Sequence, residues 1–365
     1  MRVGIDYRPV TAAPHSGISR QVLAMEAALA ELGHEPVRLT MAPAAHPHRQ
    51  SCHCPDVEVA PARLHRPEQR LRFEAGFLPR QLPRLQLDLY IATANSGLPL
   101  LRRPRVRLVT LVHDLFQLTL PGAHASALRA AVYRNMDRYL VGHAVRTADR
   151  LWTPSAYSAG ELAKLFPASA QRVRVLHNAV VPLPPPSALP EGLPPGYWLA
   201  VGSREPRKNL ALLLQRWRAL RNHGHGLPPL VVVGSALDVP SELAKSNGLH
   251  WLSGIDDATL AAVYRGAGRL FHPAWAEGFG LPVIEAMAQG TPVAAATGSA
   301  LDEILPDYAL RFDPYSPPSL DAALLRACGG RHPGETVENL QAAAARFDAQ
   351  VYRARLAELL AEACR

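Results

Sequence analysis

Sixteen residues near the middle of the chain, VPLPPPSALPEGLPPG (181–196), contain seven prolines. Proline lacks a backbone N–H and has a fixed φ, so this stretch cannot continue a helix or an inner strand. We interpret it as a stiff linker and place a domain boundary there. The alternative is a proline-rich surface loop within one domain. A chain of 365 residues is long enough for two domains of ordinary size.

On either side of this linker, short apolar runs alternate with helical patterns. The predicted strands are residues 2–7, 87–93, 106–115, 149–155 and 172–180 before the linker, and 197–203, 229–235, 249–254, 269–274 and 291–297 after it. The predicted helices are residues 19–33, 127–148, 209–224, 256–268, 281–290 and 347–365. Such alternation predicts parallel sheets. We therefore expect an α/β protein with two Rossmann-like, doubly wound domains, and a ligand site in the cleft between them at the carboxyl ends of the strands.

The composition argues against several other classes of protein. No apolar run approaches the roughly 18 residues of a membrane span, and MRVGIDYRPV at the start reads as a buried strand rather than a signal peptide. A cytoplasmic protein is therefore expected. The four cysteines suggest no disulfide framework. The segment HPHRQSCHC (46–54) is interpreted as a solvated loop, with a metal site as the alternative.

The net charge of +8 is unevenly distributed. Residues 61–107 contain ten arginines and three acidic residues, which suits an anionic surface or substrate. Within them, RLRFEAGFLPRQLPRL (70–85) interleaves arginines with aromatic residues and leucines, and we expect it to lie against the headgroups of an anionic membrane surface. Nucleic acid is not an expected partner, because the chain shows no recognition motif and has few aromatic residues.

A basic loop, VGSREPRKNL (201–210), opens the first helix after the linker. A helix N-terminus offers unpaired N–H groups and a partial positive charge, and here Arg207 and Lys208 add full charges beside it. Lys208 is one of only three lysines in an arginine-rich chain. We predict that this loop holds a diphosphate; the alternative is a solvated basic turn.

A second loop and helix, AEGFGLPVIEAMAQGTPV (276–293), carry Glu277 and Glu285 eight positions apart. The glycines between them allow the backbone to approach a ligand closely, and Pro282 suits the first turn of a helix. Two carboxylates directed at one ligand are good acceptors for sugar hydroxyls. Either glutamate alone would be read as a capping or surface acid.

Other nucleotide-binding signatures are missing from the sequence. No G-x-G-x-x-G follows the first strand of either half and there is no Walker A motif, which argues against a dinucleotide dehydrogenase and a P-loop kinase. Asp-x-Asp, the simplest clamp for a metal–diphosphate complex, is also absent. We therefore expect no metal and no cofactor, with the charges of the protein neutralising the diphosphate.

These segments together resemble the retaining glycosyltransferases of family 4, which have the GT-B fold. EGFGLPVIE looks like their E-x7-E signature, and VGSREPRKNL is similar to the donor-phosphate loop of mannosyl- and rhamnosyltransferase-like members. Further matches follow in order: LVHDL (111–115), TPSAYSAGEL (153–162), LHNAV (176–180) and SGIDDATLAAVYRGA (253–267). The resemblance covers nearly the whole chain. It implies an acceptor-binding domain at residues 1–183, joined by the C-terminal helix 347–365, and a donor-binding domain at residues 184–346.

The resemblance also implies roles for individual residues. The residues implied in catalysis are His113, Arg207, Lys208 and Glu277. The residues implied in donor binding are Gly17, Ser203, Arg207, Lys208, Gly254, Ile255, Glu277, Gly278, Phe279, Gly280, Leu281 and Glu285. Glu285 would bind the ribose, Glu277 the donor hexose, and Arg207 with Lys208 the diphosphate. His113 would face the donor sugar from the N-terminal domain.

The implied function is transfer of a hexose, mannose or a deoxyhexose such as rhamnose, from a nucleotide-diphosphate sugar, GDP-linked, with retention and without a metal. The implied acceptor is a glycan or a polyprenyl-diphosphate-linked glycan in bacterial cell-surface polysaccharide or lipopolysaccharide synthesis. The protein would act in the cytoplasm, peripherally on the inner face of the cytoplasmic membrane. Two alternatives stay open: a sugar-nucleotide-binding protein without transferase activity, and a nucleotide-sugar epimerase of the same architecture.

Overall fold

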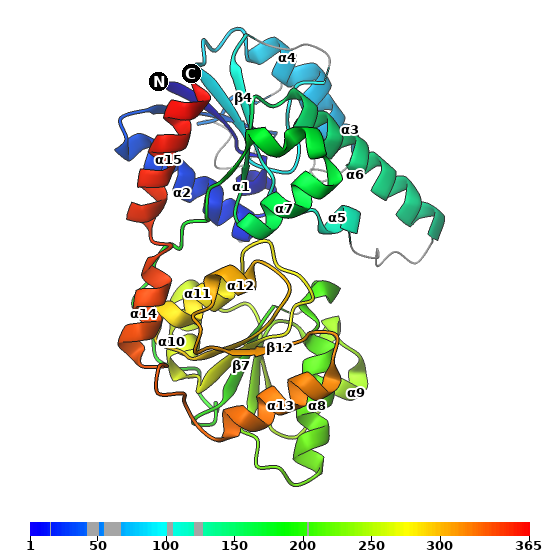
Figure 1. Ribbon diagram of the computed structural model, residues 1–365, viewed down its shortest axis with the longest axis vertical. Coiled ribbons are helices and arrows are strands. Elements are labelled where there is room, and N and C mark those ends of the chain that lie inside the picture. The colour runs from blue at the N-terminus through cyan, green and yellow to red at the C-terminus, as the bar shows by residue number, and fades with distance from the viewer. Residues whose placement is uncertain (15, 42–50, 55–66, 101–104, 120–126, 203) are drawn as a thin grey trace. The chain divides into compact units, whose positions relative to one another are not determined.

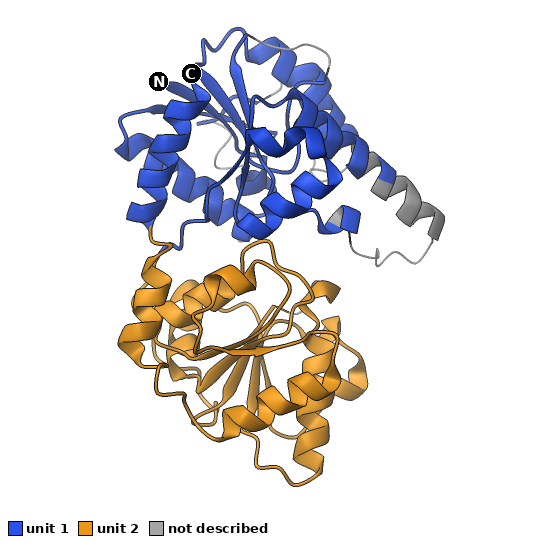
Figure 2. Ribbon diagram, in the orientation of Figure 1, with its two compact units in different colours: residues 1–181, 349–365 blue, residues 182–348 orange. Residues whose placement is uncertain are grey.

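The computed structural model describes residues 1–14, 16–41, 51–54, 67–100, 105–119, 127–202 and 204–365. The chain forms two compact units, unit 1 with residues 1–181 and 349–365 and unit 2 with residues 182–348 (Figure 2). The division falls in the proline-rich segment, two residues before the predicted boundary. Residues 347 and 348 belong to unit 2, and the chain re-enters unit 1 at Ala349.

Unit 1 is built, in its described part, on a parallel sheet of six strands in the order β2-β1-β3-β4-β5-β6. The strands are β1 (Arg2–Asp6), β2 (Glu35–Leu39), β3 (Leu89–Ala92), β4 (Arg107–Leu111), β5 (Arg150–Thr153) and β6 (Val173–Val175). The chain goes from β1 outward to β2 and then returns to the other side of β1. The order of this sheet therefore switches between β1 and β3, where open α/β sheets bind ligands at their carboxyl ends.

Helices cover both faces of the unit 1 sheet (Figure 1). They are α1 (Arg8–Ala12), α2 (Gly17–Glu31), α3 (Pro67–Leu71), the π-helical η3 (Arg72–Phe77), α4 (Leu78–Gln81), α5 (Phe116–Thr119), α6 (Ala127–Thr147), α7 (Ala156–Leu165), the 3-10 helix η4 (Pro167–Arg172) and α15 (Ala349–Ala363). Successive strand side chains point to opposite faces. Leu89 and Ile91 therefore pack with α2 and α15, whereas Tyr90 and Ala92 pack with η3, α4 and α6.

Unit 2 is built, in its described part, on a second six-stranded parallel sheet in the order β12-β11-β10-β7-β8-β9. The strands are β7 (Trp198–Val201), β8 (Leu230–Val233), β9 (Leu249–Leu252), β10 (Arg269–His272), β11 (Val293–Ala296) and β12 (Leu310–Phe312). The helices are η5 (Pro206–Lys208), α8 (Leu210–Asn222), η6 (Ala236–Asp238), α9 (Ser241–Ala244), α10 (Asp257–Gly266), α11 (Leu281–Ala288), α12 (Leu301–Ile304), α13 (Pro317–Cys328) and α14 (Val337–Ala345). This is the Rossmann order, with its switch point between β7 and β10.

The predicted α/β fold with two doubly wound, Rossmann-like domains is confirmed. Each predicted strand and helix overlaps an element of the structure, with ends that differ by a few residues. The strands β2 and β12 were not predicted. Among the described residues, no helix combines the length and the apolar character needed to cross a membrane.

A buried ion pair joins the start of β10 to the segment before α14. The Arg269 guanidinium donates from Nη1 to Oε1 of Glu335 at 2.6 Å and from Nη2 to Oε2 at 2.8 Å. The two side chains are 3% and 0% exposed. Burial without a partner strongly disfavours a charge, so each group depends on the other.

We expect Glu335→Gln to lower the free energy of unfolding by about 3–5 kcal/mol, because it leaves the Arg269 charge buried without its carboxylate. Urea denaturation followed by circular dichroism measures this. The matched control is Asp321→Asn, which removes the carboxylate of the more exposed Arg216–Asp321 pair and should cost about 1 kcal/mol or less. Equal losses of unfolding free energy in the two variants would show that the buried pair stabilises the fold no more than the exposed pair does.

Candidate functional site

The two loops that carry the predicted phosphate and sugar residues meet in unit 2. One loop follows β7 and the other follows β10, and these strands are neighbours at the switch point of the sheet. The backbone N–H of Trp275 donates to the Arg207 carbonyl at 2.9 Å, and the Arg207 side chain donates to the Ala276 carbonyl at 3.1 Å. The strand order therefore joins two segments nearly 70 residues apart in sequence into one site.

The phosphate loop turns sharply twice. Gly202, directly after β7, has a φ of +92°, a region that glycine adopts readily. At its other end Asn209 has a φ of 54° and donates from Nδ2 to the Pro314 carbonyl at 3.1 Å, after which α8 begins at Leu210. The predicted helix start at about Asn209 is thus confirmed within one residue. Between the two turns, Arg207 and Lys208 lie in η5.

Glu277 is contacted by side chains of the loop after β7 and of β10. The carboxylate is 5% exposed. Lys208 Nζ donates to its Oε1, Arg207 Nη1 lies 3.0 Å from its Oε2, and His272 Nε2 lies 2.9 Å from Oε1. The predicted catalytic residues Arg207, Lys208 and Glu277 therefore form one contiguous cluster, and the carboxylate expected to point at a ligand is already held by two cations.

The electrostatics of this cluster fix its protonation. Burial alone would raise the pKa of the Glu277 carboxyl, but Lys208, His272 and Arg207 together hold it well below its usual range. Burial lowers the pKa of the His272 imidazole, whereas the hydrogen bond to Glu277 raises it. The nearby positive charges of Lys208 and Arg207 lower this pKa further. At neutral pH the cluster therefore contains an ionised glutamate and a neutral histidine whose Nε2–H donates to it.

Glu285 lies on α11 and is held by a separate partner. Tyr264 of α10 donates from its hydroxyl to Glu285 Oε2 at 3.0 Å, and Glu285 is 8% exposed. Gly280 caps α11 with a φ of +103°, and a Cβ there would lie 2.6 Å from a methyl group of Leu301. Only glycine therefore fits the turn that separates Glu277 from the helix bearing Glu285.

The remaining predicted donor residues lie around these loops. Phe279 is a core side chain, 3% exposed and packed edge-on against Phe347 with ring centroids 5.4 Å apart. This packing involves only the side chain, so a donor contact through the Phe279 backbone stays a prediction. Leu281 opens α11 and is half-buried. Gly254, with a φ of +67°, and Ile255 follow β9. Gly278 lies between Glu277 and Phe279 in the loop, and Ser203 lies outside the described residues.

A pocket of about 490 Å³ opens beside the phosphate loop. It lies beyond the carboxyl ends of β7 and β8 and is lined by Gly202, Arg204, Lys208, Ser235 and Asp238, among others. Lys208 thus contacts both this pocket and the Glu277 carboxylate. The pocket is large enough for part of a nucleotide.

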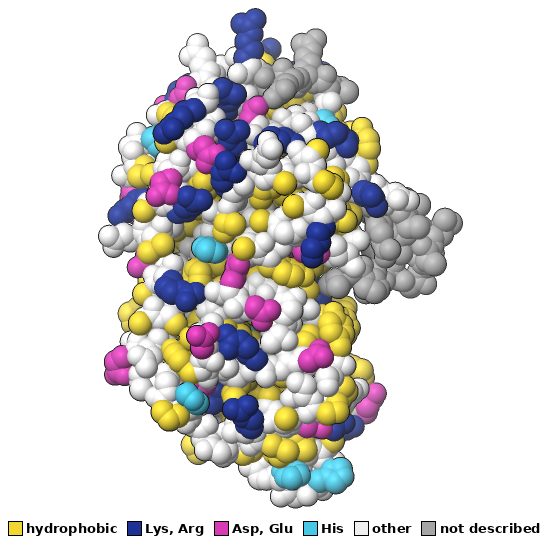
Figure 3. Space-filling view, in the orientation of Figure 1, with side chains coloured by type: hydrophobic (Ala, Val, Ile, Leu, Met, Phe, Trp, Pro, Cys, Tyr) yellow, Lys and Arg dark blue, Asp and Glu magenta, His cyan; other side chains and the backbone are white. Residues whose placement is uncertain are grey.

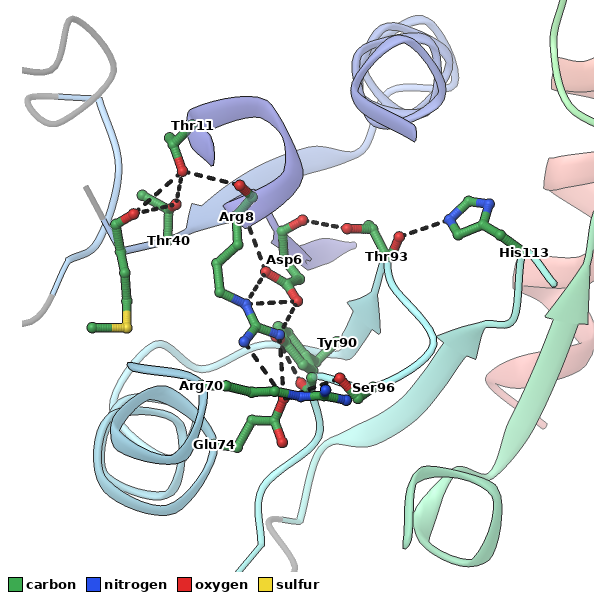
Figure 4. Close-up of polar contacts among 12 residues, drawn as sticks. Asp6, Arg8, Thr11, Thr40, Arg70, Glu74, Tyr90, Thr93, Ser96 and His113 are labelled. Carbon is green, nitrogen blue, oxygen red and sulfur yellow. Dashed lines mark hydrogen bonds and ion pairs between the residues drawn. The ribbon is translucent and has the colours of Figure 1, made fainter. Parts of the chain in front are cut away.

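The predicted residues of unit 1 lie around a second pocket. His113 follows β4, is 8% exposed and bonds through Nε2 to the Thr93 carbonyl at 2.8 Å (Figure 4). Because a carbonyl oxygen only accepts, Nε2 carries the proton and Nδ1 keeps a lone pair. Gly17 is the first residue of α2, capped by the Ser16 hydroxyl, which accepts from the Ser19 N–H at 3.2 Å. Ser16 and His113 both line the pocket.

The prediction that the apolar side chains of residues 70–85 lie against lipid headgroups is wrong. Phe73, Phe77, Leu78 and Leu82 are buried in the core between the sheet, η3, α4 and α6. These side chains lie on the buried side of η3 and α4, because both helices cover one face of the sheet. Figure 3 shows basic and acidic side chains interspersed on the drawn face of unit 1. The arginines at 63, 66, 102 and 103 lie outside the described residues.

The histidine–cysteine segment 46–54 is only partly described. His53 pairs with the edge of the sheet, where its N–H donates to the Arg38 carbonyl at 2.8 Å, and Cys52 packs against the core. Across the described part of the chain, no group of three or more histidine, cysteine or acidic side chains is arranged to hold a metal ion. Residues 46–50 lie outside that part.

Two residues of the site were not predicted from the sequence. His272 ends β10 within the apolar run RLFHPA, where a histidine is more often a satisfied core residue than a site residue. Tyr264 lies on α10 and has no motif of its own. The available signal was position: His272 ends the strand at the switch point, directly before the loop that contains Glu277.

The protonation of the buried groups predicts how stability depends on pH. Burial lowers the pKa of the His113 and His272 imidazoles, so as the pH falls below about 6.5 the unfolded chain binds protons before the native protein does. The free energy of unfolding should therefore fall from pH 7.5 to pH 5.5. The depressed pKa of Glu277 adds a further loss below about pH 4.3.

Urea denaturation at these pH values measures the loss. His272→Gln should show a smaller loss between pH 7.5 and pH 5.5 than the wild type, whereas His225→Gln, at an exposed position, should show the same loss. Equal stability of the wild-type protein at both pH values would contradict the assignment of neutral buried histidines.

Comparisons with known proteins agree with the fold. Residues 15–183 match the family model described as Glycosyltransferase Family 4, and residues 188–346 match the model described as Glycosyl transferases group 1. The chain is 30% identical over 237 residues to the O-antigen chain mannosyltransferase B of Escherichia coli, covering 60% of this chain and 61% of that protein. It is 24% identical over 269 residues to the O-antigen chain mannosyltransferase RfbU of Salmonella typhimurium, covering 72% and 69%.

Among solved structures, sucrose-phosphate synthase from Thermosynechococcus elongatus superimposes with a TM-score of 0.78 at 18% sequence identity, covering 99% of this chain and 98% of that one. A likeness at this level of identity concerns the fold. Together with the two family models, which follow one another along nearly the whole chain, it confirms the resemblance stated from the motifs. The chain belongs to the glycosyltransferases of family 4, with the GT-B fold.

Proposed function

We propose that the protein is a retaining, metal-independent glycosyltransferase of bacterial cell-surface polysaccharide or lipopolysaccharide synthesis. It moves a hexose, mannose or a deoxyhexose such as rhamnose, from a nucleotide-diphosphate sugar to a glycan. The observation that carries the proposal is the Glu277–Lys208–Arg207–His272 cluster at the switch point of unit 2. The names of the two O-antigen mannosyltransferases support the sugar and the setting, and the motif resemblance supports GDP as the nucleotide.

The diphosphate is bound by the loop after β7. Lys208 and Arg207 supply full positive charges, and the N-terminus of the 13-residue helix α8 adds a partial one. Lys208 lines the pocket of about 490 Å³ beside this loop. Both cations lie against Glu277, which fixes their positions beside this pocket.

The rest of the donor is bound by the groups around this loop. Glu285, oriented by the Tyr264 hydroxyl, accepts from the ribose hydroxyls. Glu277 and the backbone of Phe279 and Gly280 bind the hexose. The backbone at Gly254 and Ile255, after β9, receives the base.

The reaction breaks the bond between the anomeric carbon and the diphosphate oxygen. The acceptor hydroxyl oxygen forms a new bond to that carbon, and its proton leaves with the nucleotide diphosphate. Negative charge therefore grows on the leaving phosphate while positive charge grows on the sugar. Fixed cations at the leaving group stabilise this transition state more than the ground state, which is how they accelerate the reaction.

A donor panel read by nucleotide release tests the proposal. We expect release from a GDP-linked hexose that requires a glycan acceptor and persists in excess EDTA. Lys208→Met should lower kcat roughly 100-fold or more, because its charge matters most as the bond breaks. Glu285→Ala should weaken GDP binding by about 5- to 150-fold, the equivalent of about 1–3 kcal/mol for a lost acceptor. Lys245→Met, at an exposed position of unit 2, is the control.

Each alternative has its own outcome in this assay. Interconversion of free nucleotide sugars without acceptor would identify an epimerase. Donor binding by calorimetry without release would identify a binding protein. Activity abolished by EDTA and restored by magnesium would show that the cations of the loop do not replace a metal.

We further propose that the acceptor glycan is attached to a polyprenyl diphosphate and that the protein docks on the inner face of the cytoplasmic membrane through charge alone. The described arginines that suit this are Arg72, Arg80 and Arg84, all exposed. Each contributes about 1 kcal/mol near an anionic surface. Co-sedimentation should require anionic vesicles, fall with salt and weaken when these three become glutamate. Equal binding to neutral vesicles would contradict charge-driven docking.

A further inference from the structure

A basic pocket lies in unit 2 at the edge of the sheet opposite to the donor loops. It encloses about 470 Å³ beside the first residues of β10 and β12, Arg269 and Leu310. The strand β10 begins with Arg269 at this pocket and ends with His272 in the cluster around Glu277, so the pocket and the donor site lie at opposite ends of one strand. The other walls are the loop before β12, the end of α13 and the loop that connects α13 to α14 (Figure 1).

Four arginines line this pocket, and one of them is paired with a carboxylate. The charge of Arg269 is balanced by Glu335, the buried partner described above. The other three form no ion pair with a carboxylate of the described residues: Arg311, Arg326 and Arg331. Among the described lining residues, Asp307 is the one remaining acid, and it is exposed. The lining therefore has an excess of positive charge.

Arg311 is held in place by uncharged groups. Its Nη1 donates to the carbonyls of Asp307 and Ala309 at 3.2 and 3.4 Å, and its Nη2 donates to the Leu305 carbonyl at 3.0 Å. A guanidinium has five N–H donors, so at least two remain after these three hydrogen bonds. The carbonyls thus fix this half-buried side chain without neutralising its charge, which leaves it oriented for an anion.

Arg326 and Arg331 bring two further guanidiniums to the pocket. Arg326 lies in the last turn of α13, and Arg331 lies in the loop that follows it. Neither side chain has a hydrogen-bond partner among the described residues. An arginine in the last turn of a helix also interacts favourably with the helix dipole, which is reason enough for Arg326 alone. It does not explain why arginines from β12, α13 and this loop meet at one pocket.

Two rings form a flat surface beside these arginines. The ring of Tyr308 is nearly parallel to that of His332, with an interplanar angle of 8° and centroids 6.4 Å apart. A Cβ on Gly334 would lie 2.8 Å from the Tyr308 ring, so only glycine lets the loop backbone approach this ring so closely. The Gly334 N–H donates to His332 Nδ1 at 3.0 Å and fixes the imidazole. The pocket therefore has a surface for the carbon body of a ligand as well as cations for its charge.

We infer that this pocket binds a phosphate monoester of a small organic molecule, at a site separate from the donor site. Such a phosphate carries a charge of about −1.5 to −2 at pH 7 and has three strong acceptor oxygens, so it can bind several guanidiniums at once. Three unpaired arginines face one exposed carboxylate and the partial negative charge at the C-terminal end of α13, which leaves the pocket positive. The inference does not depend on the proposed transferase function.

Two probes that differ only in the phosphate test the pocket. They are glucose 6-phosphate and glucose, and calorimetry at constant ionic strength measures both dissociation constants. We expect the phosphorylated probe to bind at least roughly 100-fold more tightly, because charge-assisted hydrogen bonds to arginine replace its water. Equal binding of the two probes, or no binding of glucose 6-phosphate, overturns the inference.

Variants locate the bound phosphate. The double variant Arg326→Gln/Arg331→Gln should weaken binding of glucose 6-phosphate by roughly 100-fold, because each lost charge-assisted bond costs roughly 10-fold. The control Arg265→Gln/Lys245→Gln removes the same charge from exposed positions of unit 2 and should weaken it by less than roughly 3-fold. Equal weakening in both would show attraction to net charge only, and would overturn the inference.

Two further variants guard against misplacement and misfolding. Lys208→Met should bind glucose 6-phosphate like the wild type, and a loss there would place the probe in the donor site and overturn the inference. Asp307→Asn removes the one acid that faces the phosphate and should tighten binding by roughly 5-fold, a gain that misfolding cannot mimic. An unchanged or weaker affinity in Asp307→Asn would contradict the placement of the phosphate in this pocket.

The same phosphate chemistry occurs in soluble compounds and in the headgroup of phosphatidic acid. Co-sedimentation with phosphatidic acid vesicles distinguishes the two sources. Sedimentation that is lost in Arg326→Gln/Arg331→Gln and kept in Arg265→Gln/Lys245→Gln would identify the lipid as the ligand. Equal sedimentation of these two variants, with glucose 6-phosphate binding lost only in the first, would identify a soluble phosphate.

Discussion

The donor site depends on the burial of one carboxylate. Glu277 is 5% exposed, and a carboxylate removed from water is strongly disfavoured unless charged and hydrogen-bonding partners replace the solvent. Its three partners come from two places in the fold: Lys208 and Arg207 from the loop after β7, and His272 from the end of β10. Because all three must be present, Glu277 holds the two loops of the switch point together.

This arrangement offsets the repulsion between two neighbouring cations. Arg207 and Lys208 carry like charges, and each side chain loses rotamer entropy when it is held in one position. The Glu277 carboxylate offsets the repulsion and fixes both side chains, while the Arg207 guanidinium also binds the backbone of the neighbouring loop at Ala276. Arg207 also pairs with the more exposed Glu205 carboxylate at 2.7 Å, so both cations and both carboxylates have a partner of opposite charge.

The strands with every residue buried, such as β10, appear as apolar runs that the sequence shows clearly. The two strands that were missed, β2 and β12, both lie at the edge of a sheet, although the edge strands β6 and β9 were predicted. The sequences of the missed strands, EPVRL and LRF, include charged residues, and three of five and two of three of their positions are not buried. Their pairing depends on the sheet beside them, which local sequence does not encode.

The sites were also predicted only in part. The sequence indicated which residue types occur in them, but not which charged side chains pair with one another. In unit 2 the strand order brings the basic loop against Glu277. In unit 1 it brings Arg8 against Asp6 and Glu74, and Arg70 against Glu74, although residues 61–107 have ten arginines to three acids. The excess of arginine in the sequence therefore did not show that these two arginines are already paired. In both sheets the electrostatics of the switch point depend on which charges the strand order brings together, and not on how many charges the sequence contains.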